Sequence, residues 1–277
     1  MSGTSDPGSP FDPNWTPPEI DVTIPSVARV YDVFLGGKDN YEIDRQAAKM
    51  MSTALPEIPL IARINRHVLR RAVRYLVQEA GIRQILDVGS GLPAAGNIHQ
   101  IAQSLDAKVS VVYVDNDPIV LAHGRALLAE NDHTAVIQED ARNAQAIFNA
   151  PETRHLIDFD QPFAVFLSGV LHSLPPSADR KAVTQALTSR LGPGGYFLIT
   201  NFTDTGDPIV EQFNKATIAA GFDIGRFSTT AELHSYFDGL DLVPPGLVPA
   251  TAWRPDGEPD PEAPTARIYL MGLGRKP

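Results

Sequence analysis

The segment Ile85-Leu86-Asp87-Val88-Gly89-Ser90-Gly91 places an apolar run, a carboxylate and two closely spaced glycines one after another. Gln84 to Val88 is predicted to be a buried strand, and Asn97 to Leu105 the helix that follows it. Glycine at positions 89 and 91 allows a tight strand-to-helix turn, because a residue without Cβ adopts positive φ and lets a ligand approach the backbone. The segment therefore predicts the first strand, turn and helix of a Rossmann-like fold.

The carboxylate of Asp87, just before the turn, indicates which ligand the turn binds. Gly89, Gly91 and Ala94 also satisfy the dinucleotide fingerprint, so the glycines alone do not distinguish cofactors. Asp87 would repel a pyrophosphate but attract the α-ammonium group of S-adenosylmethionine (SAM). We therefore predict that SAM is the cofactor, contacted by Asp87, Gly89, Ser90 and Gly91. An NAD-dependent oxidoreductase is the less favoured alternative.

Two further predicted strands also end in carboxylates. Val109 to Val114 precedes Asp115-Asn116-Asp117-Pro118, and Thr134 to Gln138 precedes Glu139-Asp140-Ala141. A carboxylate at the end of the second strand can grip a ribose diol, so we expect Asp115 there, with Asn116 and Asp117 beside it. Asp117 also suits the cap and Pro118 the first position of a helix. Asp140 and Ala141 are predicted to contact adenine, although Asp after a strand is also ordinary turn chemistry.

Helical and extended patterns alternate along the rest of the chain. Helices are predicted for Ser26 to Leu35, Glu42 to Ala54, Ile61 to Val77, Ser177 to Leu191, Pro208 to Ala220 and Thr230 to Phe237. Strands are predicted for Phe163 to Leu167, Tyr196 to Thr200, Leu240 to Val243 and Arg267 to Gly272, and a loop for Asn149 to Gln161. This alternation predicts an α/β fold with one Rossmann-like, doubly wound sheet of about seven strands. The sheet is expected to be mostly parallel, with an antiparallel C-terminal edge hairpin.

The chain divides into three predicted parts. Residues 1–24 are rich in proline and are expected to form a flexible tail. Residues 25–80 are expected to form an N-terminal helical cap and the first helix covering the sheet. Residues 81–277 are expected to form the SAM-binding core, which contains a Pro/Gly-rich insertion at 244–264.

Composition excludes several classes of partner. The 23 basic and 33 acidic side chains argue against a nucleic-acid surface. The chain contains no cysteine, which excludes disulfides, thiolate metal sites and a cysteine nucleophile, and no His/Asp/Glu cluster has metal-ligand spacing. No apolar run approaches the length of a membrane span, and the first residues lack the features of a signal peptide. We expect a cytoplasmic protein with no metal, and no sequence pattern specifies its oligomeric state.

Several motifs resemble a known family. Asp87 to Gly91 and Tyr113 to Pro118 resemble the first and second motifs of class I SAM-dependent methyltransferases. Leu35-Gly36-Gly37-Lys38-Asp39-Asn40-Tyr41 and Ala62-Arg63-Ile64-Asn65-Arg66 are similar, more narrowly, to the bacterial family now called S-adenosyl methyltransferase, once a domain of unknown function. The resemblance covers Pro25 to the C-terminus. It implies the fold and the cofactor but not the methyl acceptor.

The segment after the fourth predicted strand, Ser168-Gly169-Val170-Leu171-His172, is expected to face the methyl acceptor. Ser168 is predicted to contact the cofactor, and His172 is the candidate catalytic base, because imidazole accepts a proton near neutral pH. A histidine that caps a helix or packs against the cap is the alternative interpretation. The segment lacks the Asn-Pro-Pro-aromatic pattern of amino-methyltransferases that act on nucleic acids and glutamine.

The cap supplies three more candidate contacts. The resemblance favours a lid role for the loop that carries Lys38 and Asn40, with a surface turn as the alternative. Arg63 or Arg66 is placed to pair with the SAM carboxylate through its guanidinium group, and Arg66 is the one we select. Arg70, Arg71 and Arg74 are expected to be solvated or to pair with the acidic surface. The sequence thus predicts a SAM-dependent methyltransferase with a small-molecule acceptor, and a SAM-binding sensor without transferase activity is the alternative from another class.

Overall fold

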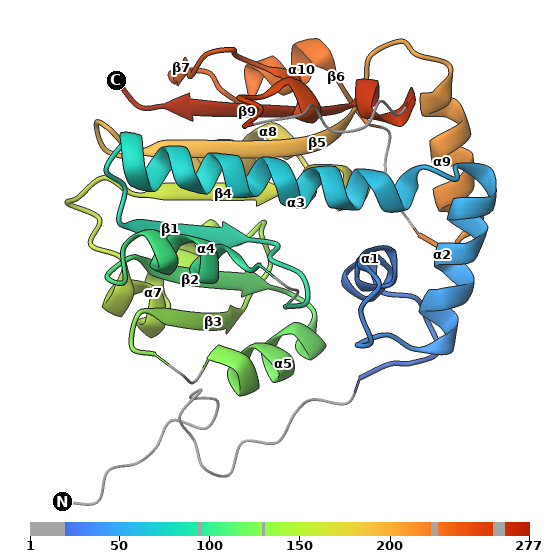
Figure 1. Cartoon of the computed structure of the whole chain (residues 1–277), viewed down its shortest axis with the longest axis horizontal. Coiled ribbons are helices and arrows are strands. Elements are labelled where there is room, and N and C mark those ends of the chain that lie inside the picture. The colour runs from blue at the N-terminus through green and yellow to red at the C-terminus, as the bar shows by residue number, and fades with distance from the viewer. Residues whose placement is uncertain (1–19, 94–95, 129–130, 223–226, 257–263) are drawn as a thin grey trace, which may run out of the picture.

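The computed structural model describes residues 20–93, 96–128, 131–222, 227–256 and 264–277, in which helices cover both faces of one twisted sheet (Figure 1). The main path of the sheet runs in the order β3-β2-β1-β4-β5-β9-β7, while β6 pairs with β5 and β8 with β9. The strands are β1 (Gln84–Val88), β2 (Ser110–Asp115), β3 (Thr134–Gln138), β4 (Ala164–Ser168), β5 (Tyr196–Asp204), β6 (Ser228–Thr229), β7 (Asp241–Leu242), β8 (Val248–Pro249) and β9 (Tyr269–Arg275).

Among the described residues, three α-helices precede the first strand, and from β1 to the last α-helix strands and α-helices alternate, with two α-helices between β3 and β4. The α-helices are α1 (Val27–Leu35), α2 (Glu42–Ala54), α3 (Ile58–Arg74), α4 (Ile98–Leu105), α5 (Pro118–Leu128), α6 (Ala144–Asn149), α7 (Pro151–Leu156), α8 (Arg180–Thr188), α9 (Ile209–Ala219) and α10 (Thr230–Ser235). In the described part of the chain, a π-helical turn, η1 (Tyr75–Glu79), continues α3, and the 3-10 helices are η2 (Leu171–Ser173), η3 (Ala250–Ala252) and η4 (Pro264–Ile268).

The doubly wound α/β sheet is confirmed. The first five strands are parallel, and β9 runs antiparallel between β5 and β7, which forms the predicted C-terminal edge. Strands β6 and β8 contain two residues each and add to the seven strands of the main path. The central strands are buried on both faces, so their sequences are nearly continuous apolar runs.

Alternate residues of each strand enter two separate hydrophobic clusters. In β1, for example, Ile85 packs on the side of α1 to α4 and α9, whereas Leu86 and Val88 pack on the side of α6, α8 and α10. Helix α3 lies along the sheet (Figure 1). Its apolar residues recur at helical spacing and are buried, so they form one face of the helix. The two clusters fix the sheet between its helical layers and thereby fix the positions of the strand ends.

Three predicted elements differ clearly from the structure, and one of them is the last strand, which begins at Tyr269 rather than Arg267 because Arg267 and Ile268 belong to η4. The segment 149–161, predicted as a loop, contains α7 and the end of α6. Pro151 starts α7 rather than breaking a helix, because the first turn needs no proline N–H. Strand β5 continues to Asp204 instead of ending at Thr200, since β9 pairs with it as far as Phe202 and β6 pairs with its last two residues.

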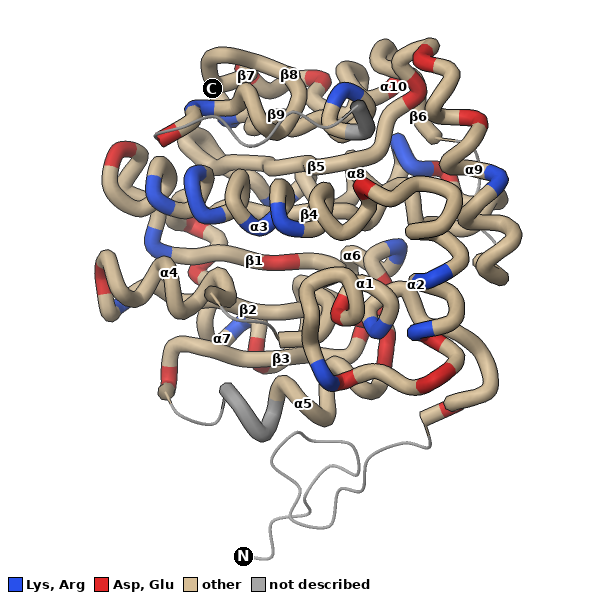
Figure 2. Tube along the Cα trace, turned by 45° about the vertical axis from the view of Figure 1, so that its right-hand side comes forward, with Lys and Arg blue, Asp and Glu red and all other residues tan. Residues whose placement is uncertain are grey.

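Several basic residues lie along α3 (Figure 2), and the sequence predicts that Arg70, Arg71 and Arg74 are solvated or pair with the acidic surface. Arg70 and Arg74 are exposed, and Arg74 Nη1 pairs with Asp256 Oδ2, in agreement with that prediction. Arg71 is buried, where its Nε donates to the Trp253 carbonyl oxygen (2.9 Å) and its Nη2 to that of Ala250 (2.7 Å). These bonds attach the 244–264 insertion to α3. The spacing of arginines along a helix does not reveal such a distant backbone partner, and so the prediction failed at this position.

The N-terminal helices α1 and α2 stand beside the carboxyl ends of the strands (Figure 1). Residues 1–19 of the predicted tail lie outside the described residues. The described residues 20–24 include Ile20, which packs against Leu92, Ile119 and Val120 of the core. The chain thus enters the fold directly beside the turn that follows β1.

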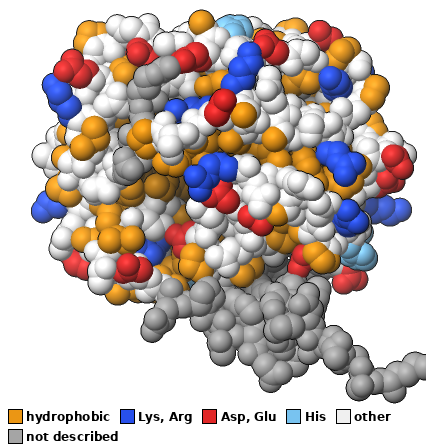
Figure 3. Space-filling model, turned by 180° about the vertical axis from the view of Figure 1, so that it is seen from behind, with side chains coloured by type: hydrophobic (Ala, Val, Ile, Leu, Met, Phe, Trp, Pro, Cys, Tyr) orange, Lys and Arg blue, Asp and Glu red, His pale blue; other side chains and the backbone are white. Residues whose placement is uncertain are grey.

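The hydrophobicity of the helices and the charge of the surface indicate whether the protein is suited to a membrane or a nucleic acid. Within the described ranges, no helix combines the length and hydrophobicity that a membrane span requires. Hydrophobic side chains gather across the middle of the face drawn in Figure 3, where acidic and basic side chains are interspersed. That view shows no continuous basic patch among its described residues, such as a phosphate backbone would require. The absence of a nucleic-acid partner stays a prediction.

Candidate active site

A cavity of about 460 Å³ lies at the carboxyl ends of the parallel strands, between the sheet and the N-terminal helices. Its volume is in the range of small-molecule sites. Most of the residues predicted from the sequence line it: Arg66, Asp87, Gly89, Ser90, Gly91, Asp115, Asn116, Asp117, Asp140, Ala141, Ser168 and His172. The parallel topology brings these residues together, because it gathers the carboxyl ends of β1 to β4 at one edge.

Asp87 is a buried carboxylate, 5% exposed, that lines the cavity. Within the described residues it has no hydrogen-bond partner. Burial raises its pKa to about 7; the charge of Arg66 opposes this rise and that of Asp115 adds to it. A carboxylate removed from water in this way is costly unless another group compensates its charge. Asp87 is thus prepared for a cationic ligand.

Asp115 at the end of β2 organises the glycine turn. Its Oδ2 accepts a hydrogen bond from Gly91 N–H (2.8 Å) and its Oδ1 one from Asp117 N–H (3.0 Å). Gly89 and Gly91 have φ of +75° and +67°, as the sequence predicts for this turn. A Cβ on Gly91 would meet no atom within 4 Å, which leaves the turn open to a ligand. Burial raises the pKa of Asp115, while its backbone hydrogen bonds act in the opposite direction.

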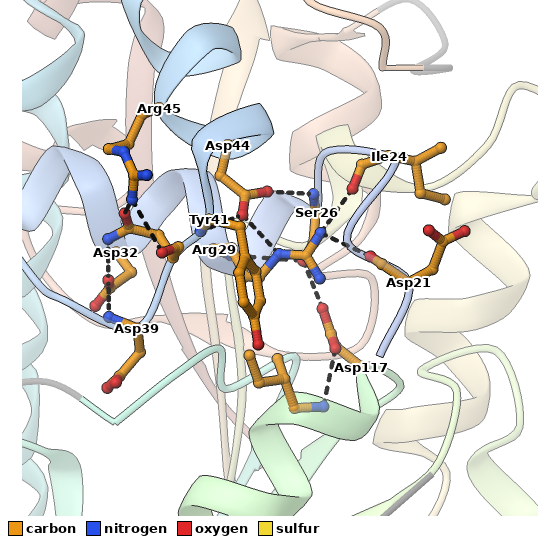
Figure 4. A network of polar contacts seen from close by, with 12 residues as sticks. Asp21, Ile24, Ser26, Arg29, Asp32, Asp39, Tyr41, Asp44, Arg45 and Asp117 are labelled. Carbon is orange, nitrogen blue, oxygen red and sulfur yellow. Dashed lines mark hydrogen bonds and ion pairs between the residues drawn. The ribbon is translucent and has the colours of Figure 1, made fainter. Parts of the chain in front are cut away.

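The first helix of the cap is joined to the loop after β2 (Figure 4). Ser26 Oγ donates a short hydrogen bond of 2.5 Å to Asp117 Oδ2, while Asp117 Oδ1 accepts from Ile119 N–H and caps α5 as predicted. Behind this contact, Arg29 Nε pairs with Asp44 Oδ2 at 2.8 Å, and both side chains are buried. The ion pair fixes α1 to α2, and Ser26 fixes α1 to the candidate cofactor loop.

Two other charged candidates, Arg66 and Asp140, already have partners. Arg66 lines the cavity and donates through Nη2 to the Gly96 carbonyl oxygen (2.6 Å). Its remaining N–H groups suit a carboxylate. Asp140 is held by Arg142, whose Nη2 lies 2.6 Å from Asp140 Oδ2, and this hydrogen bond lowers the pKa of Asp140. Arg63 is exposed on another face of α3.

Lys38 and Asn40 do not line the cavity as it is described. Asn40 Nδ2 donates to Asp32 Oδ2 (2.8 Å), and Asn40 Oδ1 accepts from Arg45 Nη1 (3.0 Å). Its amide is therefore used within the cap, while Lys38 is exposed. These hydrogen bonds within the loop agree with the alternative interpretation, a turn. They give no support to the cofactor contacts predicted for Lys38 and Asn40, which stay predictions.

His172 lies on η2, directly after β4, and lines the cavity. Its Nδ1 is 2.9 Å from Asn201 Oδ1, and burial lowers its pKa to about 4. The imidazole is therefore neutral at physiological pH. His172 also packs against Phe202, with ring centroids 5.0 Å apart, so it combines the position predicted for a base with the packing of a structural residue.

A buried polar network behind Ser168 was not predicted. Asn65 Oδ1 accepts from Ser168 Oγ (3.1 Å) and Thr200 Oγ1 (2.9 Å), and Thr200 Oγ1 lies 2.9 Å from Tyr269 Oη. Asn65 Nδ2 donates to Tyr31 Oη at 3.1 Å. Polar residues within the apolar run of β5 were the available indication, because a buried polar side chain needs a partner.

The chain was compared with protein families, with curated proteins and with solved structures. A family model described as S-adenosyl methyltransferase matches residues 13–277. No curated protein sequence matches the chain.

Two solved structures are similar over nearly the whole chain. A protein from Thermobifida fusca YX, assigned as a methyltransferase, is 44% identical, with a TM-score of 0.88 over 95% of this chain and 99% of that chain. A DUF574 family protein from Streptomyces avermitilis is 36% identical, with a TM-score of 0.88 over 94% and 100% of the two chains. An O-methyltransferase family protein from Burkholderia thailandensis shares only the fold, at 14% identity and a TM-score of 0.50 over 87% of this chain and 62% of that one.

Proposed function

Since this chain belongs to the S-adenosyl methyltransferase family and is by family a SAM-dependent methyltransferase, we propose that it binds SAM in the cavity and methylates a small molecule there. A hydroxyl, amine or carboxyl group is the proposed acceptor. The cavity lies between the sheet and a cap that touches the loop after β2. This enclosure favours a small acceptor over a macromolecule.

The observation that carries the proposal is Asp87. It is a buried carboxylate facing the cavity, without a hydrogen-bond partner among the described residues, and its pKa is raised to about 7 by burial. The α-ammonium group of SAM would supply both the positive charge and the hydrogen bonds that this carboxylate lacks. A pyrophosphate there would add negative charge to a site already occupied by Asp87 and Asp115.

The other lining residues fit the remaining parts of SAM. Arg66 would hold the methionine carboxylate, and Asp115 would accept hydrogen bonds from the ribose hydroxyls on the lone pairs that Gly91 and Asp117 leave free. Gly89, Ser90 and Gly91 would lie along the ligand. Asn116, Asp140 and Ala141 would border the adenine, and Ser168 the methionine end.

When bound, SAM supplies a methyl group made electrophilic by its sulfonium. The protein's own contribution is to orient the acceptor, exclude water and receive a proton. His172 is proposed for the last role, because its imidazole is neutral and lines the cavity. A histidine with so low a pKa is a weak base, and it suits an acceptor whose proton is itself acidic.

Calorimetric titration with SAM and with NAD tests the proposal. We expect SAM to bind and NAD not to bind; the reverse result would end the proposal. Asp115→Ala should weaken SAM binding by about 1.5–3 kcal/mol, because charge-assisted hydrogen bonds are lost. A protein that binds SAM but forms no S-adenosylhomocysteine with any small-molecule extract would be a sensor rather than an enzyme.

His172→Ala separates the two roles of the histidine. If His172 is the base, SAM affinity should stay nearly unchanged while turnover falls by roughly 10² to 10⁴. Unaltered turnover with lower stability would show that its role is structural.

A further inference from the structure

One part of the cavity is lined by aromatic rings. We call it the inner pocket and define it by Tyr31, Phe34, Phe202, Phe213, Phe222 and Tyr269. These residues come from α1, β5, α9, the segment after α9, and β9. Tyr31, Phe34 and Phe222 are only half-buried, although aromatic rings in a protein interior are normally covered. The inner pocket therefore offers ring faces and edges to a ligand.

The inner pocket carries no charge within the described residues. The acidic and arginine side chains that line the cavity come from the ends of β1, β2 and β3, from the segment after β3, and from α3, where Arg66 lies. Phe202 instead packs against Phe213 and Tyr269, with ring centroids 4.3 and 4.8 Å apart. A charged acceptor would lose its hydration here without gaining an ion pair.

The direction of the hydrogen bonds at Tyr269 follows from a backbone carbonyl. Tyr31 Oη donates to the Ala62 carbonyl oxygen (3.1 Å), so the Asn65 atom beside Tyr31 must be the Nδ2 donor. Asn65 Oδ1 then accepts a hydrogen bond from Thr200 Oγ1 (2.9 Å) and one from Ser168 Oγ (3.1 Å), which itself lies 3.0 Å from Thr200 Oγ1. With the protons of both hydroxyls directed to Asn65, we assign the proton of the Thr200–Tyr269 hydrogen bond to Tyr269. Tyr269 consequently has only oxygen lone pairs left for a ligand.

The same reasoning fixes the tautomer of His172. Asn201 Nδ2 donates to the Phe202 carbonyl oxygen (2.6 Å), which directs Asn201 Oδ1 towards His172. His172 Nδ1 also lies 3.4 Å from the backbone N–H of Phe202, but its contact with Asn201 Oδ1 is much shorter, at 2.9 Å. We assign the proton to Nδ1 on this shorter contact, which leaves Nε2 with a free lone pair. Within the described residues Nε2 has no hydrogen-bond partner. A methyl group placed on Gly169 would lie 3.7 Å from both His172 Cε1 and Tyr269 Oη, so the two acceptors border the same space.

From these observations we infer that the methyl acceptor is a neutral, planar aromatic compound with a phenolic hydroxyl. Its ring would lie among the aromatic side chains of the inner pocket, and its O–H would donate to His172 Nε2 or Tyr269 Oη. Offset-stacked and edge-to-face contacts favour an aromatic over an aliphatic ligand. A phenol, with a pKa of about 10, also releases its proton to a weak base more readily than an alkyl alcohol does. This inference rests on the proposed function.

The transfer balances with these groups alone. The acceptor oxygen forms the new O–CH₃ bond with a lone pair, and the S–CH₃ bond breaks with its electrons left on sulfur, which becomes a neutral thioether. The hydroxyl proton passes to His172 Nε2 and then to water. No oxidant, reductant or metal is required.

Binding of matched probes to the protein saturated with S-adenosylhomocysteine tests the inference by calorimetry. The probes are 2-naphthol, 2-naphthoate (charged), 2-methoxynaphthalene (no donor) and decahydro-2-naphthol (not aromatic). We expect 2-naphthol to bind at least tenfold more tightly than each of the others, and to gain one methyl group by mass spectrometry when SAM replaces the product. Equal or tighter binding of any other probe would overturn the inference.

A pair of variants tests whether the aromatic ring of 2-naphthol binds in the inner pocket. Phe34→Ala should weaken 2-naphthol binding at least tenfold and leave the affinity for S-adenosylhomocysteine unchanged, whereas Met50→Ala, an exposed position on α2 outside the cavity lining, should change neither. Unchanged naphthol binding by Phe34→Ala would also overturn the inference. If S-adenosylhomocysteine binds but no probe does, the substrate class is wrong and the proposed cofactor site stands. If S-adenosylhomocysteine itself does not bind, the proposed function fails, and the inference with it.

Discussion

Replacement of Asp87 by asparagine should stabilise the ligand-free protein while it damages the cofactor site. Asp87 is buried, and no described residue donates a hydrogen bond to its carboxylate. Its ionised form is therefore unfavourable in the native state until a cation binds. Asparagine has nearly the same shape and never ionises, so Asp87→Asn removes the cost of the charge and the attraction for the ligand together.

The size of the expected gain in free energy of unfolding follows from the pKa of Asp87. Burial raises it from 3.8 to about 7, and each pKa unit corresponds to about 1.4 kcal/mol, so the ionised carboxylate costs the native state roughly 4 kcal/mol. Below about pH 4 Asp87 is protonated in both states and costs nothing. Between pH 4 and 7 the unfolded chain loses this proton while the native protein keeps it, so stability falls as the pH rises. Above pH 7 the full cost remains.

Urea unfolding at several pH values, with and without SAM, measures this effect. We expect Asp87→Asn to exceed the parent in free energy of unfolding by up to about 4 kcal/mol at pH 8, with little difference near pH 4. SAM should stabilise the parent at pH 8 and the variant much less. Asp140→Asn is the control, because the pKa of Asp140 is lowered by Arg142 and its removal should give no gain at pH 8. Parallel stability curves for Asp87→Asn and the parent would refute the reasoning.

Three further predictions concern the cap. Asp44→Asn should lower the free energy of unfolding in urea by about 3–5 kcal/mol, because it leaves the buried charge of Arg29 unpaired; a loss below 1 kcal/mol would contradict this. Gly37→Ala would place a Cβ 1.9 Å from Asp32 Oδ1, so it should disrupt the loop and speed amide exchange in residues 36–41. Gly36→Ala is the control, because its Cβ meets no atom within 4 Å. It should lower the free energy of unfolding by only about 1–2 kcal/mol, because Gly36 has a positive φ. Ser26→Ala removes the hydrogen bond to Asp117 and should increase the dissociation rate of SAM in stopped-flow measurements, while Ser26→Thr, which keeps the hydroxyl, should not.

The residues of the candidate cofactor half of the cavity could be singled out in the sequence because their features are local. A glycine turn after β1 and carboxylates at the ends of β1 and β2 are each visible within a few residues, and parallel pairing brings the strand ends together. The cofactor contact predicted for Asn40 stays a prediction; in the structure the Asn40 side chain donates to Asp32 Oδ2, as the alternative interpretation of a turn expects.

The inner pocket could not be predicted, because its walls are assembled only by tertiary packing. Phe34, Phe213 and Tyr269 lie on α1, α9 and β9, far apart in the chain, and each alone looks like an ordinary core residue. The extension of β5 had the same cause, since the pairing with β9 and not local propensity holds Asn201 and Phe202 in the strand.

Helix α1 contacts both halves of the cavity. Ser26 at its start binds Asp117 beside the candidate cofactor loop, and Phe34 near its end lines the inner pocket. A ligand in either half that holds α1 in place therefore prepares the other half at no additional conformational cost. By thermodynamic linkage, the factor by which cofactor raises the affinity for acceptor must equal the factor by which acceptor raises the affinity for cofactor. The enzyme should consequently show positive heterotropic cooperativity between its two substrates within a single chain.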